Sequence, residues 1–248
     1  MAWSKDVLRL NPNGRVEVVT VGHGKHRVIV VDDFYADPEA VLALAQGLHY
    51  VGAGMHGNFP GTRGFLTLDT APMIAALSQL WGARLESAQV IQPVVFSALE
   101  ADVRLNVDQR LPHVDPGVSA MIWLNRPEEC AGGTGLYRHT LTGLERVPQT
   151  PTREVLQLAA RLGFRPESLE DPAAYTRFQD AIVFNPLFAA PEGEYVNDGN
   201  PYWELIYLME MRWNRMVLFD GRIPHSQYLR PGDFEGRTRL NQMLYLRG

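Results

Sequence analysis

Two side chains in the segment Leu111–Gly117 have the types and spacing of metal ligands. His113 and Asp115 are two residues apart, and on an extended strand this spacing places both side chains on one face. An imidazole and a carboxylate are two of the three ligands in the facial arrangement of two histidines and one carboxylate that binds Fe(II). The third ligand has to come from elsewhere in the sequence, and His225 is the candidate.

A strand rich in polar side chains is expected after His225, at the end of the chain. Strand alternation puts every second residue of this stretch on one face. That face carries Arg237, Arg239, Asn241, Met243 and Tyr245. Because a guanidinium can bind a carboxylate through two parallel hydrogen bonds, an arginine here could hold an acidic ligand beside the metal.

The order His-x-Asp, a long interval, His and then Arg on the last strand resembles that of the iron(II)/2-oxoglutarate-dependent dioxygenases, over roughly the C-terminal half. Residues 58–63 (Asn-Phe-Pro-Gly-Thr-Arg) and 214–221 (Asn-Arg-Met-Val-Leu-Phe-Asp-Gly) also look like a bacterial branch of that superfamily whose members have no assigned function. The resemblance implies a double-stranded β-helix, a squashed jelly-roll or cupin-like barrel of two antiparallel sheets. It also implies Fe(II) and 2-oxoglutarate as cofactors and O2 as co-substrate.

The resemblance implies that His113, Asp115 and His225 are the metal ligands and the catalytic residues. The family reaction decarboxylates 2-oxoglutarate to succinate and CO2 and hydroxylates an unactivated C–H bond. In halogenating relatives a small residue replaces the carboxylate and halide takes its place, so Asp115 favours hydroxylation. Desaturation and ring closure remain open alternatives.

The resemblance also suggests which residues bind 2-oxoglutarate. Arg239 is the first choice for its distal carboxylate, with Asn241 beside it. Arg237 is the second choice and could bind substrate instead. Tyr137 follows a Gly-rich stretch that in the superfamily often lies along the cofactor. It is therefore either a hydrogen-bond donor to 2-oxoglutarate or a partly buried structural tyrosine.

The N-terminal half has the pattern of an α+β, mainly β fold. Residues 15–20 and 27–31 are rich in valine and predict a hairpin. Asp37-Pro38 and Ala71-Pro72 have the signature of helix starts, followed by apolar residues at helical spacing. We expect these two helices to brace one sheet.

Four further segments of this half and the middle of the chain carry expectations. Residues 90–100 and 103–107 favour strands, and residues 51–64 favour a Gly-rich loop. Its Arg63 could reach a carboxylate, although an arginine after a Gly-Thr turn is more often solvated or structural. Residues 141–201 contain two helical patterns and many loop signals. This stretch is expected to be an insertion in a single domain spanning residues 1–248, acting as a lid or as a region that determines substrate specificity.

Composition excludes several classes of protein. The chain has 248 residues with 46% hydrophobic residues, which suits one large domain. A net charge of -5 argues against nucleic acid as a partner. No apolar run approaches the length of a membrane span, and the N-terminus lacks the pattern of a signal peptide. Cys130 is the only cysteine, so no internal disulfide forms, and a cytoplasmic location is expected.

The leading hypothesis is therefore a hydroxylase of a small molecule, such as an amino acid or a natural-product intermediate. A hydroxylase of peptide or protein side chains is an alternative within the same chemistry. A cupin-like barrel that binds metal or ligand without turnover is an alternative from another class, and zinc or manganese could occupy the same ligands. The oligomeric state stays open, with a homodimer as one option.

Overall fold

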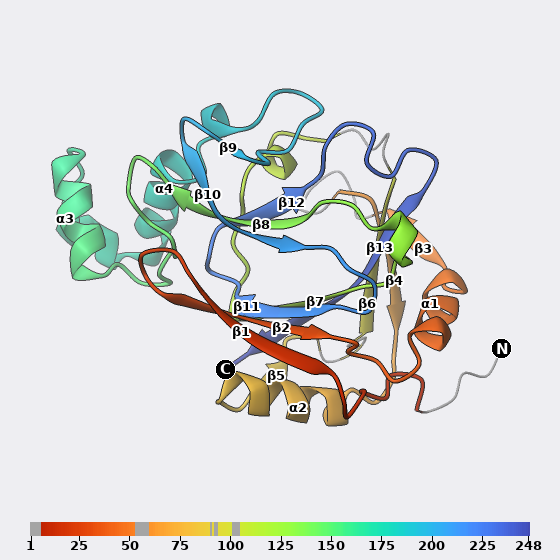
Figure 1. The fold of residues 1–248 in the computed structure, drawn as a ribbon. Helices are drawn as coiled ribbons and strands as arrows, with labels where there is room; N and C mark the ends of the chain where they lie inside the picture. The colour runs from red at the N-terminus through yellow and green to blue at the C-terminus, as the bar shows by residue number, and fades with distance from the viewer. Residues whose placement is uncertain (1–5, 53–59, 90, 92–93, 101–104) are drawn as a thin grey trace.

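The computed structural model describes residues 6–52, 60–89, 91, 94–100 and 105–248. Two antiparallel sheets face one another, and helices cover the outer side of the larger sheet (Figure 1). This arrangement is mainly β with helices on one side, as the sequence predicts. Its large antiparallel sheets are built from strands far apart in the chain.

The larger sheet has nine strands in the described part of the chain. In spatial order they are β1 (Arg15–Val21), β2 (His26–Asp32), β11 (Met216–Asp220), β7 (Val118–Trp123), β13 (Thr238–Arg247), β6 (Val94–Glu100), β4 (Thr62–Leu66) and β3 (Tyr50–Gly52), with β5 (Glu86–Ser87) also paired to β13. The smaller sheet has the order β12 (His225–Tyr228), β8 (Gly133–His139), β10 (Trp203–Glu210) and β9 (Gly199–Asn200).

Four α-helices and four short 3-10 helices complete the described structure. The α-helices are α1 (Pro38–Gln46), α2 (Ala71–Trp81), α3 (Arg153–Arg161) and α4 (Pro172–Ile182). The 3-10 helices are Asp108–Arg110, Pro127–Glu129, Pro166–Glu170 and Pro186–Phe188. None of the helices in the described ranges has the length and apolar character needed to cross a membrane.

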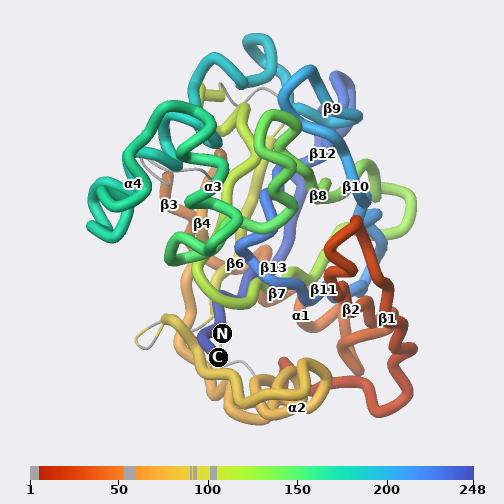
Figure 2. Tube along the Cα trace, turned by 90° about the vertical axis from the view of Figure 1, so that its left-hand side faces the viewer, coloured from red at the N-terminus to blue at the C-terminus, as the bar shows by residue number. Residues whose placement is uncertain are grey.

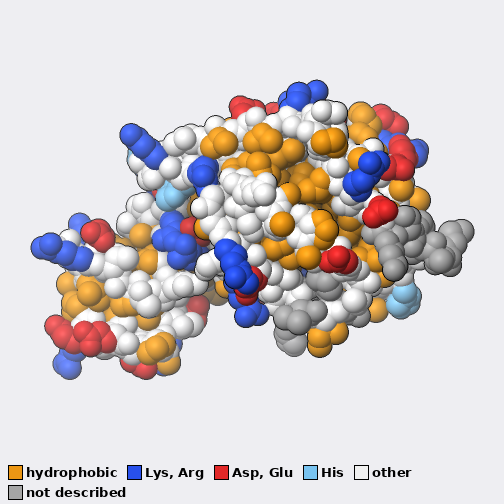
Figure 3. Space-filling view, turned by 90° about the horizontal axis from the view of Figure 1, so that it is seen from below, with side chains coloured by type: hydrophobic (Ala, Val, Ile, Leu, Met, Phe, Trp, Pro, Cys, Tyr) orange, Lys and Arg blue, Asp and Glu red, His pale blue; other side chains and the backbone are white. Residues whose placement is uncertain are grey.

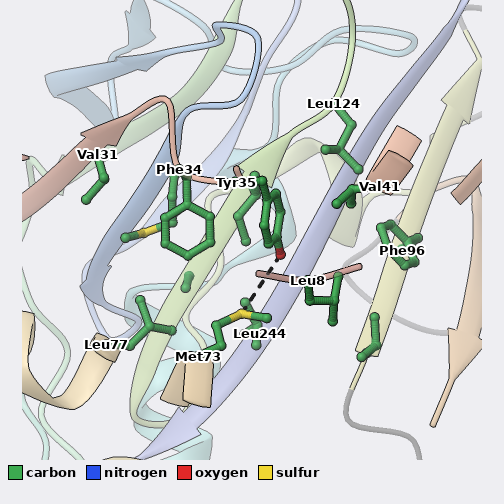
Figure 4. Packing of buried hydrophobic residues seen from close by; sticks show 14 of the residues in the cluster. Leu8, Val31, Phe34, Tyr35, Val41, Met73, Leu77, Phe96, Leu124 and Leu244 are labelled. Atoms are coloured by element: carbon green, nitrogen blue, oxygen red, sulfur yellow. Dashed lines mark hydrogen bonds between the residues drawn. The ribbon is translucent and has the colours of Figure 1, made fainter. Parts of the chain in front are cut away.

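Strand alternation divides the buried residues of the larger sheet between two cores. On β7, Ala120 and Ile122 face helices α1 and α2, whereas Met121 and Trp123 face the smaller sheet. Figure 4 shows the helix-side core, in which the Tyr35 hydroxyl lies 3.9 Å from the sulfur of Met73. The inner core lies between the sheets, and Arg239 and Asn241, two of the polar side chains expected to bind ligands, line the space on this inner side.

The predicted hairpin and both predicted bracing helices are confirmed. Strands β1 and β2 pair along their whole length. The carboxylate of Asp37 accepts a hydrogen bond of 3.1 Å from the Ala40 amide, which caps α1. Helix α2 begins at Ala71, with Pro72 in its first turn. Both helices pack their apolar faces on the larger sheet.

The segment between β8 and β9 contains two α-helices, at the two helical patterns that the sequence shows there. Its helices α3 and α4 lie over the end of the two sheets that faces the viewer in Figure 2. They share an apolar cluster of their own, which includes Leu158, Leu169 and Phe178. In the view from below, this part stands out as a lobe on the left-hand side (Figure 3).

Two expectations for the N-terminal half are wrong. The described residues 105–107 form no strand, because the chain turns there into the 3-10 helix Asp108–Arg110; residues 103 and 104 lie outside the described residues. The segment 51–64 is not simply a loop, since β3 and β4 occupy its two ends and β4 pairs with β6. Residues 58 and 59, in the segment 58–63, also lie outside the described residues.

Candidate metal centre and the cavity around it

The backbones of His113 and His225 pair with one another directly. The His113 amide donates to the His225 carbonyl over 2.9 Å, and the His225 amide donates to the His113 carbonyl over 2.8 Å. Two residues further on, the Asp115 amide donates to the Gly221 carbonyl over 2.8 Å. The extended segment that carries His113 and Asp115 is therefore held against the start of β12 by main-chain bonds.

This pairing brings the three expected metal ligands together. One ligand atom from each of His113, Asp115 and His225 lies within 4.8 Å of the other two. The Nε2 atom of His225 is 3.4 Å from Oδ2 of Asp115, and the two imidazole ring centroids are 4.4 Å apart. Among the described residues, these three form the one group of His, Cys, Asp and Glu side chains close enough to hold an ion.

Neighbouring groups orient two of the three ligands. The Nδ1 atom of His225 lies 2.8 Å from the Ile223 carbonyl. Because a carbonyl only accepts, Nδ1 carries the proton and the lone pair of Nε2 points at the ion site. The ring of Phe219 meets the His225 ring edge-on, with centroids 5.0 Å apart. The Ser119 hydroxyl donates to Oδ2 of Asp115 over 3.1 Å.

A glycine at position 221 permits the close approach of the two ligand segments. A Cβ atom at Gly221 would lie 2.9 Å from the Cβ and the carbonyl oxygen of Asp115, and 2.9 Å from Oγ of Ser119. The Cβ and the carbonyl oxygen of Asp115 cannot move away by a side-chain rotation, because their positions are set by the backbone. A side chain at position 221 would therefore displace Asp115 or its hydroxyl partner.

Burial and neighbouring groups put two of the candidate ligands, His113 and Asp115, in the protonation states that a metal needs. Burial lowers the pKa of His113 to about 4, and the charges of His225 and Arg63 add to the effect. Burial alone would raise the pKa of the Asp115 carboxyl, but the neighbouring His225 and His113 and the hydrogen bond from Ser119 outweigh burial and hold that pKa well below its usual range. At neutral pH, His113 is therefore a neutral imidazole and Asp115 a carboxylate.

The three ligands open into a cavity of about 350 Å³ between the two sheets. The wall formed by the larger sheet contributes Arg63, Met121, Arg239, Asn241, Met243 and Tyr245. The wall formed by the smaller sheet contributes Thr134, His225 and Gln227. The face that alternation predicts for β13 is confirmed from Arg239 to Tyr245.

Arg239 is a buried cation in this wall. Its side chain is 2% exposed, and its guanidinium donates to the Gly133 carbonyl over 3.3 Å and to Oδ1 of Asn241 over 3.4 Å. Its Nε atom has no hydrogen-bond partner, and within the described chain no carboxylate forms an ion pair with it. Burial lowers the pKa of Arg239 to about 10, partly offset by Tyr195 and Cys130, so the group stays charged at neutral pH.

Two polar residues that line the cavity, Gln227 and Tyr195, were not predicted from the sequence. Both side-chain polar atoms of Gln227 are buried, and neither has a hydrogen-bond partner in the part of the chain that the structure describes. Gln227 lies two residues after His225 on β12, so alternation from His225 could have identified it. Tyr195 comes from the insertion and also lines the cavity, but no local sequence signal marks it.

Two candidate ligand-binding residues are not brought to the cavity. Arg237 precedes β13 and donates to the Glu128 carbonyl over 3.1 Å, with its side chain at the surface. It therefore does not share the face of Arg239. Tyr137 is fully buried in a separate apolar cluster, and its hydroxyl donates to the Asn197 carbonyl over 2.9 Å. Neither residue is among those that line the cavity in the described structure.

The sequence left Arg63 open between contact with a carboxylate and a solvated or structural role, and the structure places its side chain in the cavity. Arg63 lies on β4, and its side chain lines the cavity together with the three metal ligands. Its Nη2 atom lies 3.4 Å from the Tyr245 hydroxyl. The cavity therefore contains two arginines, only one of which the sequence placed there.

Several solved structures are similar to this chain at low identity. The non-heme alpha-ketoglutarate-dependent carbocyclase SnoK from nogalamycin biosynthesis has 10% identity and a TM-score of 0.43, covering 91% of this chain and 81% of that one. HygX from Streptomyces hygroscopicus has 14% identity, covering 91% and 82%. Its TM-score is 0.41 with nickel, 2-oxoglutarate and hygromycin B bound, and 0.40 with nickel and 2-oxoglutarate. Similarity at this level carries no argument about function.

Sequence comparisons give a family and no characterised relative. No curated protein sequence matches the chain. The model of a family of unknown function, DUF6445, matches residues 12–182 and 167–235. These two matches cover most of the chain, including all three candidate metal-ligand positions, so the protein belongs to the DUF6445 family.

Proposed function

We propose that this protein is an Fe(II)/2-oxoglutarate-dependent oxygenase that hydroxylates an unactivated C–H bond of a small molecule. The observation that carries the proposal is the set of residues that line a single cavity. A His-Asp-His ligand set lines the same space between the two sheets as a buried arginine, which has no carboxylate partner among the described residues. We also assign the two facing sheets to the double-stranded β-helix that this chemistry commonly uses.

The ligand set fits a divalent metal with open positions. Two imidazole nitrogens and one carboxylate oxygen are the donors of the facial arrangement, and they leave three adjacent positions for other ligands. His225 and Asp115 are each oriented by a neighbour, Ile223 and Ser119 respectively. Zinc and manganese accept the same donors, so the bound metal has to be measured.

The cavity wall fits a dicarboxylate that would reach from the metal to Arg239. The guanidinium has an unpartnered Nε atom, and a buried cation is costly unless an anion accompanies it. Asn241 lies beside it at 3.4 Å. Gln227 is on the same face of β12 as His225 and has an unsatisfied amide. The distal carboxylate of 2-oxoglutarate would satisfy Arg239, and Gln227 would contact the ligand along its length.

The residues of this chain would bind, orient and exclude water. His113, Asp115 and His225 would hold the metal, and Arg239 would fix one end of the co-substrate. When bound, Fe(II) and 2-oxoglutarate supply the chemistry: O2 is consumed, one oxygen atom enters succinate, CO2 is released, and the other oxygen atom enters the substrate C–H bond as hydroxyl. Tyr195 would close the cavity from the insertion, which we assign to substrate selection.

The alternative of a barrel that binds metal without turnover does not account for Arg239. A site that holds only an ion has no need of a second, cationic group that is buried in the same cavity. A peptide hydroxylase would use the same chemistry, but no feature of the described residues favours a peptide over a small molecule. The small-molecule oxygenase therefore remains the proposal.

The test is an anaerobic titration of the metal-free protein with Fe(II) and then 2-oxoglutarate. A weak visible charge-transfer band should appear only when both are present. Arg239→Met should lose the band at 2-oxoglutarate concentrations that saturate the wild type, because the distal carboxylate loses its counter-charge. Arg237→Met is the matched control, since Arg237 lies outside the cavity, and its band should be unchanged.

Two results of this titration would refute the proposal. Absence of the band in the wild type, combined with tight binding of another metal, would assign the protein to the non-catalytic barrels. A band that persists in Arg239→Met with unchanged 2-oxoglutarate affinity would show that the co-substrate lies elsewhere.

A further inference from the structure

Tyr195 separates the metal cavity from a second, smaller hollow. This outer hollow has a volume of about 70 Å³ and is lined by Tyr195 with Leu99, Glu194 and residues 229–233, among others. Glu194 and Arg230 of this lining are exposed, so the outer hollow lies at the surface. Within the described structure, Tyr195 is the one residue that lines both spaces, and it is therefore the partition between them.

The outer hollow adjoins the part of the cavity that contains Arg239. Leu99, which lines the outer hollow, pairs with Arg239 between β6 and β13. The hydroxyl partner of Asp115, Ser119, pairs instead with Tyr245, at the other end of the cavity face of β13. The partition therefore stands at the Arg239 end of the cavity and not at the metal ligands.

The Tyr195 side chain is buried, but neither a hydrogen bond nor core packing holds it. Tyr195 is 9% exposed, and its hydroxyl has no hydrogen-bond partner among the described residues, although a buried tyrosine usually finds one. In the other buried tyrosines of the described structure, the hydroxyl donates to a group of the chain: Tyr35, Tyr137, Tyr175 and Tyr228. The Tyr195 ring also belongs to none of the four apolar clusters that the described residues form.

The chemistry of this hydroxyl fits an anion bound at Arg239. Burial raises the pKa of Tyr195, so the hydroxyl keeps its proton at neutral pH and can donate it to a hydrogen bond. The charge of Arg239 offsets part of this rise, which places the hydroxyl within electrostatic reach of the guanidinium. Because a guanidinium has no acceptor, Arg239 itself cannot satisfy the hydroxyl. A carboxylate paired with Arg239 would supply the missing acceptor.

We propose that Tyr195 is a gate at the Arg239 end of the cavity, and that bound 2-oxoglutarate holds this gate shut. In the ligand-free protein the unbonded side chain can turn and connect the cavity with the outer hollow. When 2-oxoglutarate is bound, its distal carboxylate accepts a hydrogen bond from the Tyr195 hydroxyl, and the ring closes the cavity behind it. This proposal rests on the oxygenase function proposed above, and it assigns the exchange of co-substrate to the outer hollow.

The first test measures how fast 2-oxoglutarate enters and leaves. Protein loaded with Fe(II) is mixed with 2-oxoglutarate without oxygen in a stopped-flow instrument, and the charge-transfer band is followed at several concentrations to obtain both rate constants. Tyr195→Phe should dissociate about tenfold faster or more, because a hydrogen bond to a charged group is lost. Its association rate should be unchanged, since the ring still fills the same space. Tyr195→Ala should raise both rates, because the gate is absent.

The matched control for the lost hydroxyl is Tyr175→Phe. The Tyr175 hydroxyl also belongs to the insertion, but it donates to the Pro148 carbonyl over 2.9 Å and lies outside the cavity lining. Both rate constants of this variant should equal those of the wild type.

The second test needs neither Fe(II) nor 2-oxoglutarate. Thr134 lines the cavity and is 2% exposed, so Thr134→Cys in a Cys130→Ser background gives a single reporter thiol inside it. Adding Tyr195→Ala should speed its modification by methyl methanethiosulfonate at least about tenfold, and Tyr195→Phe should leave the rate unchanged. Ala88→Cys is the control reporter, because the Ala88 amide donates to the Tyr245 carbonyl at the other end of the cavity, and Tyr195→Ala should not affect it.

Each contrary result has a separate meaning. If Tyr195→Ala does not speed modification of the Thr134→Cys thiol, Tyr195 does not close the cavity and the proposal fails. If Tyr195→Phe and Tyr195→Ala raise only the dissociation rate, and equally, the hydroxyl is a ligand contact and no gate exists. If Tyr195→Phe keeps wild-type rates, 2-oxoglutarate does not hold the gate. If the wild type shows no band, the oxygenase function fails, and the thiol modification alone decides whether Tyr195 closes the cavity.

Discussion

His113 and His225 exchange two main-chain hydrogen bonds, of 2.9 and 2.8 Å, so the position of each imidazole is set by the backbone of the other. Main-chain bonds, and not a metal ion, therefore position the side chains of the candidate ligands. The main-chain bonds and the bond between Asp115 and Gly221 hold the ligand segments without any ion. The site is therefore expected to be preorganised, and removal of one imidazole should leave the fold intact.

The first prediction concerns His225→Ala. This variant should lose more than about a hundredfold in affinity for Fe(II) or Ni(II), since even the outer partners of metal ligands are worth ten- to hundredfold. Its circular dichroism should match the wild type, because the backbone pairing does not depend on the side chain. Equilibrium dialysis with Ni(II) measures the affinity.

His23→Ala is the matched control, since the His23 side chain is 84% exposed and lies outside the cavity lining. It should bind Ni(II) as the wild type does. Wild-type affinity in His225→Ala would remove His225 from the ligand set.

The second prediction concerns Gly221→Ala. The added methyl group would lie 2.9 Å from Asp115 and Ser119, so the carboxylate has to move and metal affinity should fall about ten- to hundredfold. Gly52→Ala is the control, because a Cβ there meets nothing within 4 Å. Calorimetric titration with Ni(II) measures both variants. Equal affinity in the two variants would mean that Asp115 is not held in place by this contact.

Part of the candidate metal centre could be predicted from the sequence because a local rule is enough to place it. Alternation puts His113 and Asp115 on one face, and the same rule puts Arg239 and Asn241 side by side on β13. The rule fails at Arg237, because the strand begins at Thr238 and a turn precedes it. Because β13 begins after Arg237, strand alternation predicts the wrong face for the Arg237 side chain.

The other residues of the cavity depend on long-range packing that local patterns do not encode. Arg63 reaches the cavity because β4 pairs with β6, and a Gly-rich sequence gave no sign of that strand. Tyr195 lines the cavity because the insertion folds back over the sheets. Tyr137 has the expected sequence context, but its hydroxyl is directed to Asn197.

The third prediction uses the unsatisfied amide of Gln227. A buried donor and acceptor without partners cost stability. Gln227→Leu should therefore raise the free energy of unfolding of the ligand-free protein by about 1 kcal/mol. The same change should weaken 2-oxoglutarate binding, because the ligand loses a hydrogen-bonding neighbour. Urea unfolding and the Fe(II)/2-oxoglutarate titration measure the two effects.

Gln179→Leu provides the contrast, since the Gln179 amide donates to the Pro148 carbonyl over 3.2 Å. This variant should lose about 1 kcal/mol of stability and leave 2-oxoglutarate binding unchanged. If Gln227→Leu is destabilised to the same degree, the Gln227 amide has a partner in the ligand-free protein and its assignment to the ligand is wrong.

The fourth prediction concerns acid stability and the ion pair that joins β2 to the start of β11. The guanidinium of Arg215 donates to both carboxylate oxygens of Asp32, over 2.6 and 3.0 Å. This bonding lowers the pKa of Asp32 more than partial burial raises it. The pair therefore stabilises the fold fully above the unfolded-state pKa of about 3.9, and this contribution is lost as pH falls through the lower pKa of the folded state.

Asp32→Asn should accordingly lower the free energy of unfolding by about 1–2 kcal/mol at pH 7. The difference from the wild type should shrink below about pH 4, where the wild-type carboxylate also becomes protonated. Asp33→Asn is the matched control: its carboxylate is 51% exposed and pairs with an Arg15 side chain that is 73% exposed, and asparagine tolerates its positive φ. That variant should be near neutral at both pH values. Urea unfolding at pH 7 and pH 3 measures all three proteins, and a deficit in Asp32→Asn that stays constant with pH would show that lost packing, not lost charge, destabilises it.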